Sequence, residues 1–95
     1  MTWKLLHGAV QDRPRKVIHV VRVVDQILAP EKTDDLAERM RQRALSRYGD
    51  QTADVVVVQG DTKETLRLTG DPHCVRRVRA AMFSAELTWS PIELD

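Results

Sequence analysis

Two valine-rich segments constrain the fold of this chain more than any other feature. Residues 16–28, KVIHVVRVVDQIL, are dense in β-branched side chains, with early polar interruptions only at His19 and Arg22. Residues 53–59, ADVVVVQ, repeat the pattern over a shorter length. β-Branched residues favour strands, and a strand that is apolar on both sides needs cover on both faces of its sheet. The sequence therefore predicts a sheet whose central strands are shielded on two sides.

Helical spacing of apolar residues predicts two helices, over residues 31–48 and 72–86. Gly49 is placed to end the first helix, while Asp71 is a suitable N-cap for the second and Pro72 suits its first position. The two apolar stripes consist of Leu36, Ala37, Met40, Ala44 and Tyr48, and of Val75, Val78, Met82 and Ala85.

The remaining segments predict further strands. Residues 63–69 alternate apolar and polar side chains, and the turn at residues 60–62 would join them to 53–59 as a hairpin. Residues 87–90 suggest a short edge strand, since Pro91 excludes a central position. Residues 1–14 are either an N-terminal extension or an additional strand.

The resulting order is β-α-β-β-α-β, which resembles the ferredoxin-like split arrangement in element order. This α+β fold would place both helices on one face of a mostly antiparallel four-stranded sheet. At 95 residues the chain is expected to form a single domain over 1–95, with 15–95 as its core.

Composition narrows the class of protein. Fifteen Lys and Arg residues against 14 Asp and Glu residues give a net charge of +1, which excludes a histone-like basic protein. The single cysteine excludes an internal disulfide. The N-terminus lacks a long apolar stretch, and the longest apolar run is 55–58, so we expect a cytoplasmic protein with no membrane contact.

Few residues are candidates for catalysis or metal binding. The three histidines and Cys74 are the only soft ligands, and their positions predict no converging set, so no metal or cofactor is expected. Cys74 would lie in the first turn of a helix, which favours a thiolate, but no base can be assigned to it. We therefore interpret Cys74 as structural and favour a binding module over an enzyme.

Arginines on the second helix give the clearest indication of a binding surface. A helical wheel groups Arg76, Arg79 and Phe83 away from the apolar stripe, with Arg77 beside them. An exposed aromatic ring flanked by arginine is typical of a contact with a protein or nucleic acid. The alternative is that Phe83 packs under the C-terminal segment and the arginines form a solvated rim.

Residues 65–82, TLRLTGDPHCVRRVRAAM, resemble the closing strand, turn and helix of a K-homology RNA-binding domain. The GxxG loop with which that family clamps a nucleic-acid backbone is absent from this sequence. The resemblance therefore implies no function here.

Three functional hypotheses follow. The first is a non-catalytic binding or regulatory module that forms a homodimer through the sheet face left uncovered by two helices on the opposite side. The second is an RNA- or DNA-binding module that uses the basic residues of the second helix, with Arg13, Arg15 and Lys16. The third is an enzyme with a small pocket on the open face, near His19, Arg22 and Arg67.

Overall fold

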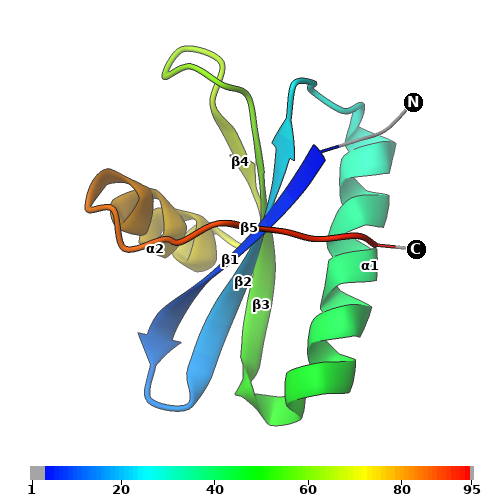
Figure 1. The fold of residues 1–95 in the computed structure, drawn as a ribbon. Helices are drawn as coiled ribbons and strands as arrows, with labels where there is room; N and C mark the ends of the chain where they lie inside the picture. Colours follow the sequence, from blue (N-terminus) through cyan, green and yellow to red (C-terminus); the bar gives the residue numbers. More distant parts are fainter. Residues whose placement is uncertain (1–3, 95) are drawn as a thin grey trace.

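The structure, a computed structural model, describes residues 4–94 and contains a five-stranded sheet with two helices (Figure 1). The expected α+β class and element order are confirmed, and most of residues 1–14 form the additional strand; Trp3 lies outside the described residues. None of the helices in the described range is long and apolar enough to span a bilayer. The elements are β1 (Lys4–Arg13), β2 (Lys16–Val24), α1 (Pro30–Tyr48), the 3-10 turn η1 (Gly49–Gln51), β3 (Thr52–Gln59), β4 (Arg67–Thr69), α2 (Pro72–Phe83) and β5 (Ser90–Pro91).

The strand order in the sheet is β4-β3-β2-β1-β5. β2 and β3 are parallel neighbours joined by α1, and the other three pairings are antiparallel. Because the two valine-rich strands lie side by side, their side chains form continuous apolar surfaces on both faces of the sheet.

The two helices cover opposite faces, which corrects the prediction that they share one (Figure 1). Val21, Val23, Val55 and Val57 pack with α1, through buried side chains that include Met40. The alternate positions of the same strands pack with α2. This second cluster contains Ile18, Val20, Val56, Val58, Cys74, Val78 and Ala81.

Self-association through the sheet was expected to cover an exposed apolar face, and the structure leaves no such face on β2 and β3. The expected open face does not exist, because each of the two apolar faces of β2 and β3 has its own helix. Self-association itself stays a prediction, and it would have to use another surface.

Buried polar contacts fix the start of α1 against the sheet. The side chain of Gln59, at the end of β3, accepts a hydrogen bond from the Leu28 backbone N–H and donates one to Thr33 Oγ1 at 3.2 Å. Gln59 and Thr33 are both buried. These bonds satisfy polar groups that would otherwise be costly in the core.

Several element ends differ from the sequence-based bounds. β2 stops at Val24 rather than residue 28, because Asp25 takes a positive φ of 75°. β4 is only three residues long, since Thr62 and Thr65 hydrogen-bond to each other within a longer loop. α2 ends at Phe83 rather than at residue 86, because Ala85 takes a positive φ of 58°.

The C-terminal segment wraps around the edge of the sheet (Figure 1). Leu87 and Trp89 pack on the α2 face, against Gly8 of β1, where an added Cβ would lie 3.1–3.2 Å from their side chains. β5 then pairs with β1, and Ile92 and Leu94 pack on the α1 face. This covers the outer edge of β1, which would otherwise offer unpaired backbone groups.

Candidate functional site

The orientation of α2 follows from its cap and its apolar stripe. Asp71 accepts a hydrogen bond from the Cys74 backbone N–H at 3.2 Å, and Pro72 occupies the first turn, as the sequence predicts. Cys74, Val78 and Ala81 are buried against the sheet. The opposite side of the helix is therefore held outward by packing on a rigid element.

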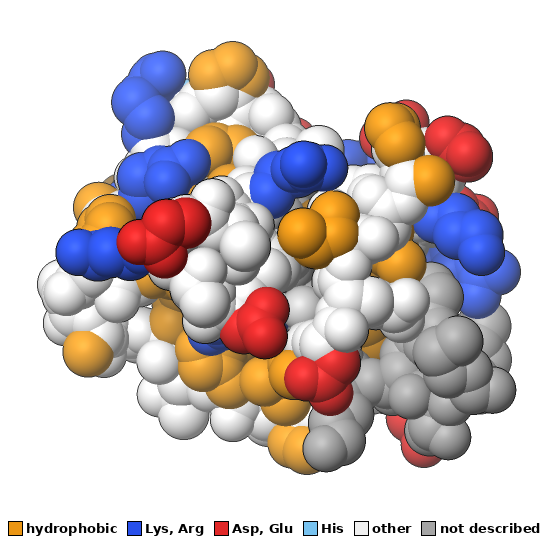
Figure 2. All heavy atoms as spheres, turned by 90° about the horizontal axis from the view of Figure 1, so that it is seen from above, with side chains coloured by type: hydrophobic (Ala, Val, Ile, Leu, Met, Phe, Trp, Pro, Cys, Tyr) orange, Lys and Arg blue, Asp and Glu red, His pale blue; other side chains and the backbone are white. Residues whose placement is uncertain are grey.

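That outward side carries Arg76, Arg79 and Phe83, all of them exposed. Phe83 is 66% exposed, so it does not pack under the C-terminal segment. The Lys63 ammonium, from the loop between β3 and β4, lies 5.8 Å from the centre of the Phe83 ring. We call Lys63, Arg76, Arg79 and Phe83 the α2 surface. In Figure 2, Lys, Arg and hydrophobic side chains lie close together on the side of the molecule where α2 lies, with an Asp or Glu side chain next to them.

The cations of the α2 surface are available to a partner. Within residues 4–94, none of the ion pairs involves Lys63, Arg76 or Arg79. A ring face beside a cation is attractive electrostatically, as for Lys63 and Phe83. Arg76 and Arg79 place two further exposed cations on the same side of α2.

Arg77 is held apart from this surface. Its Nη2 lies 2.8 Å from Glu86 Oε2, and its Nε donates to the Gln11 backbone carbonyl at 3.2 Å. Hydrogen bonds from Arg77 and then Ser84 lower the pKa of Glu86, so the pair stays charged at neutral pH. Arg77 thus ties α2 to β1.

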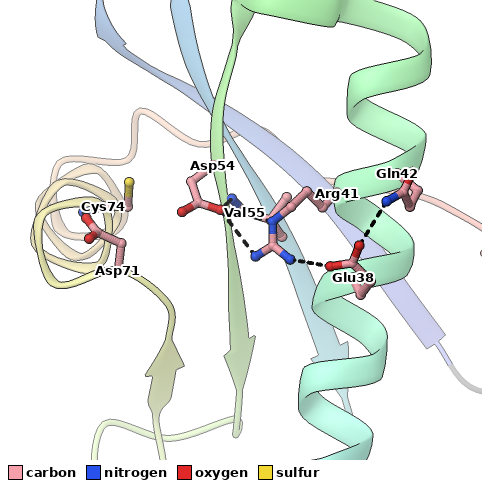
Figure 3. Close-up of polar contacts among 7 residues, drawn as sticks. All are labelled: Glu38, Arg41, Gln42, Asp54, Val55, Asp71 and Cys74. Carbon is pink, nitrogen blue, oxygen red and sulfur yellow. Dashed lines mark hydrogen bonds and ion pairs between the residues drawn. The ribbon is translucent and has the colours of Figure 1, made fainter.

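Cys74, which lies on α2 close to Asp71 (Figure 3), has the character of a core residue. Its side chain is buried, and burial, followed by the negative charges of Asp71 and Asp54, raises its pKa to about 11. The thiol is therefore protonated at neutral pH, and the effect of the helix start is outweighed. Asp54 is itself engaged by Arg41 of α1, at 3.3 Å.

The three residues expected on an open face are dispersed. His19 is buried on the α1 face, whereas Arg22 lies on the α2 face with its guanidinium carbon 5.4 Å from the centre of the Trp89 ring. Arg67 lies on β4, two strands away from β2. They do not form one pocket.

Lys63 is the member of the α2 surface that sequence reasoning missed. The sequence predicts a strand at this position, whereas the structure places Lys63 in a loop that is longer than the predicted turn. Only the contact with Phe83 reveals it. In the described part of the chain, no three His, Cys, Asp or Glu side chains converge as metal ligands would.

Comparison with known proteins identifies no relative of this chain. No protein-family model matches this sequence, and neither a curated protein nor a solved structure shows significant similarity to it.

Proposed function

We propose that this protein is a non-catalytic binding module and that its α2 surface binds single-stranded nucleic acid. The observation that carries the proposal is the 66% exposed ring of Phe83, with the Lys63 ammonium 5.8 Å from its centre and with Arg76 and Arg79 exposed on the same side of α2. Within residues 4–94, these three cations form no ion pair. Single-strand binders combine cations that follow the phosphates with aromatic rings on which bases stack. The α2 surface offers both on a rigid helix.

Salt dependence tests the electrostatic half of the proposal. Affinity for a fluorescent oligothymidylate or oligouridylate is measured by anisotropy at several salt concentrations. Release of counterions by three cations predicts a slope of log K against log salt of about −2. The double variant Arg76→Gln/Arg79→Gln keeps only Lys63 and should reduce the slope to about −0.7.

Stacking is tested by Phe83→Ala, which should weaken binding about 5- to 150-fold at constant salt. Phe83 is exposed, so the variant should fold normally. Arg39→Gln is the matched control, because it removes an exposed arginine of α1 that pairs with Asp35 at 3.1 Å. Unchanged affinity in Phe83→Ala, or equal losses in Arg39→Gln and Arg76→Gln, would refute the assignment.

The proposed nucleic-acid binding uses the α2 surface, whereas the predicted homodimer would use a face of the sheet. Sedimentation equilibrium of the free protein tests self-association, and repeating it with the oligonucleotide shows whether the two are linked. A dimer that forms without nucleic acid would require an interface outside the two covered sheet faces.

A further inference from the structure

A second group of functional side chains lies on the other side of the sheet, near the end of α1. His7 Nε2 lies 3.1 Å from His19 Nδ1, and the two rings stack with centroids 5.4 Å apart. The ring of Tyr48, the last residue of α1, stacks on His19 with centroids 4.9 Å apart. Tyr48 is 45% exposed, so one aromatic ring of this cluster is available to solvent.

Two cavities adjoin at this cluster. One, of about 260 Å³, is lined by the three rings and by Ala9, Val17 and Gln51. The other, of about 190 Å³, shares His7 and Tyr48 and extends between α1 and β5. We call the two together the α1 cleft. Both cavities are smaller than a site for a drug-sized ligand, so a ligand with a single ring is the appropriate size.

The second cavity is positively charged. Arg43 and Arg47 of α1 line it together with Ser90 of β5. Across the described residues, neither arginine takes part in an ion pair. His7 and Arg43 line the same cavity. Burial and then the charge of Arg43 lower the pKa of His7.

Local structure does not explain this arrangement fully. Basic residues late in a helix complement its dipole, which accounts for their presence in α1. Like charges four residues apart nevertheless repel, and the dipole does not explain why a cavity with a histidine lies opposite. An anion between Arg43 and Arg47 would relieve the repulsion.

His19 adds an independent observation. It is 3% exposed, and its Nε2 has no hydrogen-bond partner among residues 4–94. Nearly all buried polar side-chain atoms in proteins have a partner, so an exception next to a cavity points to a missing one. His19 is one of the residues that line the larger cavity.

We propose that the α1 cleft binds a small aromatic anion, an aryl carboxylate or an aryl phosphate. Arg43 and Arg47 hold the oxyanion, and the ring packs in the larger cavity against His7 and Tyr48. Charge-assisted hydrogen bonds from guanidinium groups to carboxylate or phosphate provide the polar part of the affinity. Stacking on the flat side chains provides the apolar part.

Four probes separate the contributions: phenyl phosphate, benzoate, inorganic phosphate and benzyl alcohol. Binding is followed by NMR through the ring signals of His7, His19 and Tyr48. We expect one or both aryl anions to saturate with a Kd of about 1 mM or below. Inorganic phosphate and benzyl alcohol should each bind at least about tenfold more weakly. Comparing the affinity of phenyl phosphate with that of benzoate shows whether the site prefers a phosphate or a carboxylate.

Variants locate the site. Arg43→Gln should weaken binding of the aryl anion about tenfold or more. Arg47→Gln, at an exposed position, gives a second test if the first variant folds poorly. Arg76→Gln removes a charge from the α2 surface and should leave the affinity unchanged, so this proposal and the proposed nucleic-acid binding can fail separately.

Three results would overturn the inference. One is the absence of saturable binding by either aryl anion. Another is equal binding of benzyl alcohol or of inorganic phosphate, which would remove the need for a charge or for a ring. The third is wild-type affinity in both Arg43→Gln and Arg47→Gln.

Discussion

The burial of His19 predicts that the protein loses stability in mildly acidic solution. The imidazole is 3% exposed, and burial followed by the neighbouring His7 lowers its pKa from 6.5 to about 4. In the folded state the ring therefore stays neutral at a pH where the unfolded chain already binds a proton. Protonation in the fold would place a charge beside His7, and the described part of the chain provides no acceptor for the Nε2 proton.

The magnitude follows from the shift. A difference of roughly 2.5 in pKa, at about 1.4 kcal/mol for each pH unit, corresponds to a contribution of about 3–4 kcal/mol. Because the folded-state pKa lies below the unfolded value, this stability is fully present above pH 6.5 and is lost as the pH falls to about 4. Below that pH the contribution of His19 is constant.

Urea unfolding at pH 7, 6, 5 and 4 measures this loss, with the free energy of unfolding extrapolated to water. His19→Gln should show a smaller fall in stability over the same range, since the side chain no longer titrates. His73→Gln, a matched change at an exposed histidine, should keep the full fall because His19 is intact.

An NMR titration of the wild-type imidazole gives a check that does not depend on a variant. A midpoint for His19 near 4 agrees with the reasoning. A midpoint near 6.5, or identical pH dependence in His19→Gln and wild type, would refute it.

Three further predictions concern the core. Met40→Ala should cost about 2–5 kcal/mol in chemical denaturation, whereas Met82→Ala should cost less because Met82 is only partly buried. Gln59→Leu should cost about 1–3 kcal/mol in the same assay, since the buried Leu28 N–H loses its acceptor, and an unchanged midpoint would contradict this role. Cys74 should react with iodoacetamide far more slowly than free cysteine at neutral pH, because its pKa is about 11; faster reaction would argue for a functional thiol.

The candidate site was predictable in part from local pattern. Helical spacing alone places Arg76, Arg79 and Phe83 on one side of α2, because a helix fixes the relative directions of its side chains. Spacing could not decide whether Phe83 is exposed, since that depends on the path of the C-terminal segment. Lys63 joins the α2 surface only through the shape of a loop.

The sequence by itself determined the local conformations and the demand for burial. Valine-rich runs specify strands with two apolar faces, and Asp71 with Pro72 specifies the start of α2. Such signals act over a few residues, through backbone sterics and short hydrogen bonds.

Only the tertiary structure decided which face each helix covers and which distant residues meet. The parallel pairing of β2 with β3 and the path of the chain after β4 place α2 on the face opposite α1. That placement determines how the second apolar face of the sheet is buried. The contacts of His19 with His7 and with Tyr48 likewise depend on the register of β1 against β2 and on the packing of the end of α1. These arrangements depend on how the sheet and both helices bury their apolar surfaces together. No single segment of the sequence specifies that packing.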